Sequence, residues 1–476
     1  MPNQEIPFIG GAYESRSKNV NAQRCINFYP EIDQTGGEVI SLQPTPGLKV
    51  WKDYSTADPV RVLFSSNDYL WTVIGNTVYR IDANKNSTTC TGTLGTSTGQ
   101  VYMVENSDGE LMIVDVSGGN GYYISGTTVA EITDTDFITP YHLAYQDGYG
   151  IVPEKDTDTF WLSALNDFSS WDALDYSSAE SLPDDVLGAI SDGNELWMLG
   201  RKTSEAYQNT ANPDFPFERI NSVTQRVGIS APASLLLLDN SLFWLDNWGN
   251  VRRMVGYTPA IISSHQIGYQ ISTYSTINNA VACGYVHEGK SFYIITFPSA
   301  NAGKGVTWCY DVSTGMWHQR ASYPNAPDGR WRGVCQAFFE NTNLFGDYEL
   351  GKIYELDHTI YKDDGEILPA VRRGQTFETN RQRFSINRFE VQIEPGVGIA
   401  TGQGSDPQIM MRYSKDFGHT WSNEKWMSMG KIGEYSSRAV RRRLGIMRSF
   451  TPEVTITDPV NRVLTGATID IKPGIS

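Results

Sequence analysis

Short apolar segments that alternate with polar positions and end at turn residues occupy most of the chain. Residues 70–74 and 77–81 alternate in this way, and Gly75-Asn76 separates them. A Gly-Asn pair between two alternating segments is typical of a tight β-hairpin. Asp108-Gly109 precedes a similar segment, and Asp192-Gly193-Asn194 precedes another. The pattern therefore predicts antiparallel strands joined by short turns.

These strands recur in units. New units begin near residues 60, 100, 141, 186, 234, 281 and 332, and each shows about three strands. Intervals of about 40 to 50 residues are the period of propeller blades. One blade cannot hide both of its faces, whereas a ring of blades buries them against neighbours. We expect an all-β fold whose central part, residues 60–369, is a β-propeller of about seven blades, with six to eight as the range.

The two ends of the chain differ from this unit. Residues 1–59 are irregular and rich in Gly, Pro, Asn and Gln, which predicts an extended N-terminal arm with the first short strands. Residues 370–476 contain alternating segments such as 389–393 and 466–471. Alternation over about 100 residues predicts a separate C-terminal β-sandwich domain.

Charge divides the chain in the same way. The net charge of −16 splits into −22 for residues 1–369 (22 basic, 44 acidic) and +6 for residues 370–476 (16 basic, 10 acidic). A change of sign between segments indicates domains with different partners. The acidic part is unsuited to bind nucleic acid by neutralising phosphates. An acidic wall would instead repel DNA and let it slide.

Targeting, membrane and metal signals are not found. The N-terminus has neither the basic nor the apolar stretch of a signal peptide, and the apolar run 235–238 is too short to span a bilayer. We expect synthesis in a cytoplasm and no membrane-spanning segment. Five dispersed cysteines favour buried reduced thiols over disulfides or zinc. Six isolated histidines predict no metal or cofactor site.

One short motif has a known relative among carbohydrate-active proteins. Residues 414–421 match the Ser-x-Asp-x-Gly-x-Thr-Trp Asp-box of sialidases, through Ser414, Asp416, Gly418, Thr420 and Trp421. In this motif the Asp accepts backbone N–H groups, Gly permits positive φ and Trp packs under the hairpin. We expect a structural turn without a catalytic part, because a sialidase propeller would repeat the box within its blades. A carbohydrate-active or carbohydrate-binding propeller is the alternative function.

Candidate catalytic acids are weak. Asp184-Asp185 and Asp363-Asp364 are neighbours in predicted turns. Adjacent residues seldom face each other at the roughly 5–9 Å that a glycosidase pair needs. No nucleophile or phosphate-binding motif accompanies them. The sequence therefore predicts no catalytic residues.

The densest basic run, Arg438, Arg441, Arg442 and Arg443, is a possible partner-facing strand. Regular alternation would place Arg441 and Arg443 on one side and Arg442 on the other. A solvated or subunit-facing strand is the favoured interpretation, another protein partner is the second, and DNA is the third.

Several stretches resemble a known family. They are residues 21–31 (Asn-Ala-Gln-Arg-Cys-Ile-Asn-Phe-Tyr-Pro-Glu), 44–48, 178–188, 203–207, 441–445 and 466–471. In these stretches the chain resembles the packaged-DNA stabilisation, or tail hub (tail accessory), proteins of short-tailed phages of enteric bacteria. The likeness extends over nearly the whole chain and is dense in these patches.

The resemblance implies a late virion protein of the tail. Such a hub is a homo-hexamer attached below the portal-adaptor, the head-to-tail connector. It helps to seal and stabilise packaged DNA, anchors tailspikes or tail fibres and the tail needle, and takes part in genome ejection through the short tail. Double-stranded DNA passes through its channel without sequence-specific binding. The resemblance brings no catalytic residue and no cofactor.

Overall fold

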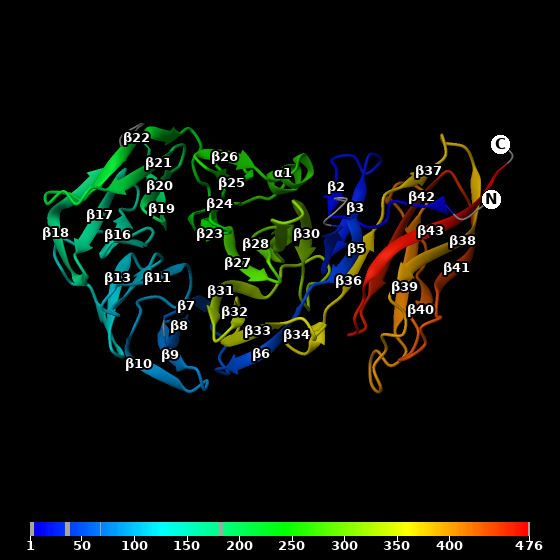
Figure 1. The fold of residues 1–476 in the computed structure, drawn as a ribbon, viewed down its shortest axis with the longest axis horizontal. Coiled ribbons are helices and arrows are strands. Elements are labelled where there is room, and N and C mark those ends of the chain that lie inside the picture. Colours follow the sequence, from blue (N-terminus) through cyan, green and yellow to red (C-terminus); the bar gives the residue numbers. More distant parts are fainter. Residues whose placement is uncertain (1–3, 34–38, 67, 180–183, 475–476) are drawn as a thin grey trace.

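A computed structural model describes residues 4–33, 39–66, 68–179 and 184–474 of the chain. Seven small antiparallel sheets surround a common centre at one end of an elongated molecule, and a β-sandwich forms the other end (Figure 1). The predicted all-β fold of propeller and sandwich is confirmed. Three parts of the sequence-based predictions lie outside the described residues. They are residues 180–183 of the stretch 178–188, residues 1–3 of the predicted arm and residues 475–476 of the predicted sandwich.

Each blade has four strands. Blades one to four are formed, in order, by β7 (Val60–Ser65), β8 (Tyr69–Ile74), β9 (Thr77–Asp82) and β10 (Ser87–Thr93); β11 (Val101–Glu105), β12 (Leu111–Asp115), β13 (Asn120–Ser125) and β14 (Thr128–Glu131); β15 (Ala144–Gln146), β16 (Tyr149–Pro153), β17 (Thr159–Ala164) and β18 (Asp167–Ser178); and β19 (Val186–Asp192), β20 (Glu195–Gly200), β21 (Ser204–Asn209) and β22 (Phe217–Gln225). Blades five and six are formed by β23 (Leu236–Leu238), β24 (Ser241–Leu245), β25 (Val251–Val255) and β26 (Thr258–Ile261); and β27 (Val281–His287), β28 (Lys290–Phe297), β29 (Val306–Asp311) and β30 (Met316–Arg320). Blade seven is formed by β31 (Gly333–Phe339), β32 (Thr342–Asp347), β33 (Lys352–Asp357) and the N-terminal strand β6 (Gly47–Asp53).

The first strands of the blades begin within three residues of the predicted unit starts. The second strands are the most apolar, and β12 and β24 are buried along their whole length. Most outer strands are exposed, as in β10, where Cys90 alone is buried. The sequence therefore predicted three strands per unit where the structure has four, because an exposed outer strand has no apolar alternation to mark it.

An N-terminal strand closes the ring. The innermost strands lie side by side in chain order, and β31 of blade seven lies against β7 of blade one. The outer strand of blade seven is β6, which pairs with β33 from Gly47↔Asp357 to Asp53↔Lys352. A short hairpin, β34 (Lys362–Asp363) and β35 (Glu366–Ile367), extends this sheet beyond β6. The two ends of the propeller sequence are thus joined within one blade.

The sandwich also takes strands from both ends of the chain. One sheet has the order β4 (Phe28–Ile32), β5 (Val39–Pro44), β43 (Leu464–Pro473), β38 (Phe384–Ile393) and β41 (Ala439–Met447), with β1 (Gln4–Glu5) beside β43. The other has the order β3 (Ala22–Ile26), β36 (Ala370–Arg373), β42 (Ser449–Ile456), β39 (Gln408–Ser414) and β40 (Lys425–Ser428), with β2 (Tyr13–Glu14) beside β3 and β37 (Phe377–Glu378) beside β42. Strands β1–β6 of the predicted arm are therefore shared between the sandwich and the propeller.

Propeller and sandwich are joined through this arm. Strand β3 pairs with β30 of blade six at Ile26↔Gln319, so the sheet of blade six continues into the sandwich. The fully buried Asn27 joins the end of blade six to the residue that precedes β36, because its amide donates to the carbonyls of Ala321 (2.9 Å) and Pro369 (2.7 Å). One hydrophobic core, which contains Phe28, Ile295 and Phe389, runs through both parts. The two domains consequently pack as one body.

A buried arginine fixes the arm to the sandwich. Arg372 on β36 donates to the carbonyls of Phe8 (2.5 Å), Gly11 (3.0 Å) and Arg24 (3.3 Å), and to the side-chain oxygen of Gln23 (2.5 Å). Burial lowers the pKa of Arg372 to about 10. The acceptors thus replace the water that would otherwise hydrate the buried guanidinium. In turn, Arg372 is the donor that satisfies the hydrogen-bonding capacity of these oxygens.

Helices are few and short. The α-helix α1 (His265–Ser272) follows blade five and is capped by Ser264, and the 3₁₀ turns η1 (Pro232–Ser234) and η2 (Asn301–Gly303) lie in connections. In the part of the chain that the structure describes, no helix has the length and apolar character to cross a bilayer. All five cysteines are free, as expected, and four are buried. Burial raises the pKa of the Cys25 thiol to about 11.

Candidate docking surfaces and the junction cavity

The Asp-box forms the turn that follows β39. Ser414 Oγ donates to Asp416 Oδ1 (2.6 Å) and accepts the N–H of Gly418 (2.8 Å), whose φ is +90°. Thr420 donates its N–H to Asp416 Oδ1 (2.8 Å) and its hydroxyl to Oδ2 (2.6 Å). Burial acts to raise the pKa of Asp416, but the bonds from Ser414 and Thr420 hold it at about 2. The carboxylate is thus occupied by the turn and is charged at neutral pH.

The Asp-box tryptophan covers an ion cluster inside the sandwich. Glu453, which is 1% exposed, accepts from Arg373 Nε (2.7 Å) and Arg412 Nε (2.5 Å). The two guanidinium groups lie 4.7 and 4.9 Å from the centre of the Trp421 ring. Cation–π contact with one partly buried ring attracts both guanidinium groups to this cluster. These contacts give Trp421 a packing role.

The basic run lies on β41, the last strand of its sheet. Arg438, just before the strand, makes a bidentate ion pair with Glu390 (2.7 and 2.6 Å). Arg441, Arg442 and Arg443 are exposed, and no carboxylate among the described residues pairs with them. They are the free part of the predicted basic strand.

A β-bulge interrupts the alternation that we expected in this strand. The register passes from Ile386↔Gly445 to Arg388↔Arg442, so two residues of β41, Arg443 and Leu444, oppose one residue of β38. Arg443 adopts a φ of +60°. Bulges bend an edge strand and redirect its side chains. All three arginines therefore face solvent, and Leu444 points into the core instead.

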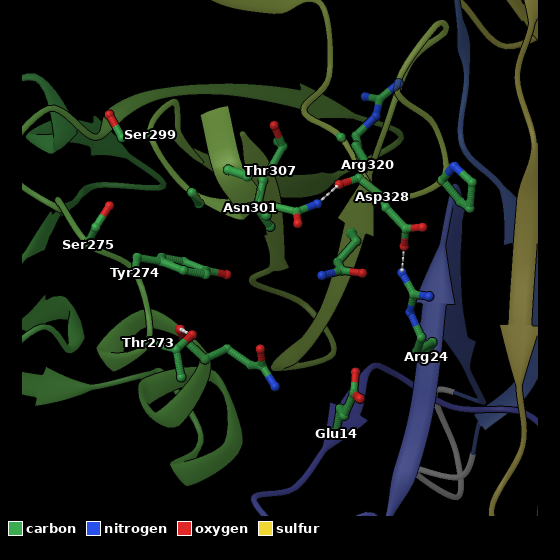
Figure 2. A pocket seen from close by; sticks show the side chains of 17 residues that line it. Glu14, Arg24, Thr273, Tyr274, Ser275, Ser299, Asn301, Thr307, Arg320 and Asp328 are labelled. Carbon is green, nitrogen blue, oxygen red and sulfur yellow. Dashed lines mark hydrogen bonds and ion pairs between the residues drawn. The ribbon is translucent and has the colours of Figure 1, made fainter. Parts of the chain in front are cut away.

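A polar cavity of about 600 Å³ lies where the N-terminal strands, α1 and blade six meet (Figure 2). Figure 2 shows Arg24 paired with Asp328 (2.7 Å), whose carbonyl accepts from Asn301 (2.5 Å). Tyr274 accepts from Trp308 Nε1 (3.0 Å), and burial raises the pKa of Tyr274 to about 12. Arg320 on the same wall has buried Nε and Nη1 groups without a hydrogen-bond partner among the described residues, so the cavity offers contacts for a polar ligand.

The two carboxylate pairs are separated by their hydrogen bonds. Asp184 accepts the N–H groups of Lys202 (2.5 Å) and Thr203 (2.9 Å), whereas Asp185 pairs with Arg201 (2.7 Å).

In the same way, the buried Asp363 accepts from the Leu48 N–H (3.0 Å) and Ser322 (2.6 Å), whereas Asp364 pairs with Lys352 (2.8 Å). Among the described residues, no three His, Cys, Asp or Glu side chains could together hold a metal ion. The carboxylates of both pairs therefore hold turns and strands in place.

Fold and surfaces together define a protein built of a β-propeller and a β-sandwich that share strands. A family model described as Bacteriophage P22 Gp10, beta-propeller, matches residues 4–361. A second, described as Bacteriophage P22 Gp10, beta-sandwich, matches residues 371–472. The chain therefore belongs to the bacteriophage P22 Gp10 family, the packaged-DNA stabilisation or tail hub proteins of phages. This confirms the resemblance found in the sequence.

Curated proteins give no match. Among solved structures, the extracellular domain of a putative one component system from B. thetaiotaomicron has 9% identity and a TM-score of 0.45, over 92% of this chain and 61% of that one. The Neurospora crassa Pan2 WD40 domain has 7% identity and a TM-score of 0.41, over 69% and 98%. An exo-beta-1,3-galactanase from Phanerochaete chrysosporium has 10% identity and a TM-score of 0.28, over 90% and 100%. Scores this low carry no argument about function.

Family membership sets the coarse function. A phage tail hub family implies localisation in the virion tail, and it points to a structural rather than an enzymatic protein. The engaged carboxylates of the Asp-box and of both Asp pairs agree with that role.

Proposed function

We propose that this protein is the tail hub that closes the DNA channel of a short-tailed phage after packaging. Six copies form a ring below the portal-adaptor. The ring anchors tailspikes or tail fibres and the tail needle, and it opens for genome ejection. The family match over both domains is the observation that carries the proposal. The protein is made in the host cytoplasm, which suits its free thiols.

The way the chain closes on itself supports a mechanical role. Strand β6 closes blade seven, and Asn27 and Arg372 hold the arm to both domains. Pulling the arm out of one copy therefore requires several buried hydrogen bonds to break together. A hub that retains packaged DNA must resist outward force, and shared strands distribute such force over both domains.

Charge supports the passage of DNA without sequence-specific binding. Residues 1–369 carry a net charge of −22. DNA is held by proteins mainly through basic contacts to phosphate, and sequence is read by side chains placed against base edges. An acidic channel wall offers neither, so double-stranded DNA slides past it.

Retention of DNA tests this function directly. Particles that contain DNA, portal and adaptor but lack this protein should expose their genome to added nuclease. Purified protein should restore protection when it is added before the nuclease. An unrelated protein of similar size and net charge is the control and should give no protection. Loss of DNA that the added protein leaves unchanged would overturn the proposal.

The carbohydrate-active alternative has one remaining observation in its favour, the polar junction cavity with Tyr274 on its wall. It makes a separate prediction, because such a protein would bind or cleave host polysaccharide without portal or adaptor. Release of reducing sugar that is abolished by one carboxylate substitution would establish it in place of a hub-only function.

A further inference from the structure

The negative charge of the propeller is concentrated in three of its blades. Residues 101–225, which form blades two to four, contain 22 acidic and 4 basic side chains, a net charge of −18. These blades, β11 to β22, lie at the opposite end of the longest axis from the sandwich, whose C-terminal segment, residues 370–476, has a net charge of +6 (Figure 1). The molecule is therefore strongly dipolar along its length.

The acidic end has a protruding strand segment. Strand β18 is the outer strand of blade three, and its register jumps from Trp171↔Ser163 to Tyr176↔Trp161. The extra residues between these pairs bulge away from β17. They include Asp172 and Asp175, and next to them Leu174 is 79% exposed. We call residues 172–175 the acidic bulge.

The carboxylates of the acidic bulge lack a cationic partner. Among the described residues, no Lys or Arg forms an ion pair with Asp172 or Asp175. Burial and the neighbouring Asp172 raise the pKa of Asp175. A cation brought to this place would relieve the repulsion between the two carboxylates.

The basic end presents the matching surface. Arg441, Arg442 and Arg443 are exposed and unpaired among the described residues, and Ile446 on the same strand is 62% exposed. We call these four residues the arginine edge. Each of the two surfaces is an edge strand that combines exposed apolar side chains with charges of one sign. Exposed edge strands are surfaces on which other chains pair, and complementary charge selects the partner.

We propose that the arginine edge of one copy docks on the acidic bulge of a second copy, head to tail. The inference rests on the proposed hub, because a ring of copies needs a contact between neighbours. Two different patches at opposite ends of the molecule form a heterologous contact, which generates a closed ring when the rotation between neighbours permits it. The acidic bulge of the first copy and the arginine edge of the second then remain available to further copies.

Charge reversal tests the contact in the full chain. The edge variant carries Arg441→Glu, Arg442→Glu and Arg443→Glu, and the bulge variant carries Asp172→Arg and Asp175→Arg. Self-association is measured by native mass spectrometry at low ionic strength, alone and with portal-adaptor rings. Each variant should lose at least tenfold in self-association, and salt should weaken the wild type in the same direction.

Mixing the two variants gives the sharpest result. The reversed edge of the first fits the reversed bulge of the second, and the two unchanged surfaces also fit each other. The mixture should therefore assemble, with both variants present in equal number and alternating. One protein with all five substitutions should also associate with itself.

Matched controls separate this contact from general charge effects. Lys18→Glu, Lys85→Glu and Lys304→Glu make the same change in charge at exposed positions outside the sheet that holds the arginine edge. Asp58→Arg and Asp68→Arg make the same change in charge as the bulge variant, at exposed positions at the start of blade one. Both control proteins should associate like the wild type. Circular dichroism should show all variants folded.

The outcomes distinguish this inference from the proposed function. The inference is wrong if the edge variant assembles like wild type, as it would if the arginines only protect an exposed edge, or if the mixture does not assemble. A wild type that stays monomeric on its own and on the rings also overturns it. Duplex DNA bound by the wild type and lost in the edge variant, without rescue by mixing, would assign the arginines to DNA. Six copies of the edge variant bound to each portal-adaptor ring, as with the wild type, would leave the hub standing and remove only this contact.

Discussion

Leu48 on β6 provides a direct energetic test of how the propeller closes. Its side chain is 1% exposed and packs in a core with Trp331, Phe345 and Tyr354 of blade seven. Replacing Leu48 with Ala removes buried methyl groups and leaves a cavity, because the sheets on either side cannot fully collapse. Leu-to-Ala changes at such positions cost about 2 to 5 kcal/mol. We expect about 3 kcal/mol here.

Val50 is the matched control on the same strand. It lies two residues further along β6, pairs with Tyr354 in the backbone register, and is 41% exposed. Val50→Ala should cost no more than about 0.5 kcal/mol, as is usual at exposed positions. Unfolding in urea, followed by tryptophan fluorescence, measures both changes in the same background. Trp331, one of twelve tryptophans in the chain, lies in the affected core.

The difference between these two substitutions is the result that matters. Equal costs, or a cost below about 1 kcal/mol for Leu48→Ala, would mean that β6 does not close blade seven. Chain ends that are free of the propeller would produce that result, because Leu48 would then be solvated. A larger loss at Leu48 alone supports closure by the arm.

Three further predictions follow from the buried and bonded groups. Arg372→Met keeps the aliphatic stem but leaves four acceptors without their donor, so we expect a loss of about 3 kcal/mol and rapid proteolytic cleavage near residue 10. Burial lowers the pKa of His142 to about 4, below the ordinary 6.5. The neutral imidazole therefore contributes its full stabilisation above pH 6.5, and the free energy of unfolding falls as the pH drops from 6.5 towards 4. His142→Phe should reduce this fall in urea unfolding curves measured between pH 4 and 6.5. Asp416, with its pKa lowered to about 2, stabilises the fold above pH 4 and loses this effect as pH falls through 2, so Asp416→Asn should be less stable at pH 7 and equal to wild type near pH 2 in thermal melts.

Much of the propeller could be predicted from sequence because its inner strands carry their own signal. The second strands β12 and β24 are buried on both faces and are bounded by turn residues. Their spacing fixes the number and position of the blades. The outer strand β10 contains one buried residue, Cys90, and therefore has no pattern to detect.

Features that depend on distant residues could not be predicted. The partner of β6 lies about 300 residues away, and nothing in the sequence of β6 names β33. The bulge at Arg443 depends on how β41 fits against β38, so regular alternation gave the wrong orientation there. The cluster of Glu453 with Arg373 and Arg412 exists only after three strands have paired. Sequence located the basic run and the Asp-box, and the fold showed which of their groups are free.

The composition of the complex formed on portal-adaptor rings tests the central claim most directly. Purified protein is added in excess to the rings, unbound protein is removed, and the product is weighed by native mass spectrometry and imaged. The hub account predicts six copies arranged with sixfold symmetry beneath the adaptor. Rings that remain bare, or that take up copies without a fixed number, would contradict it.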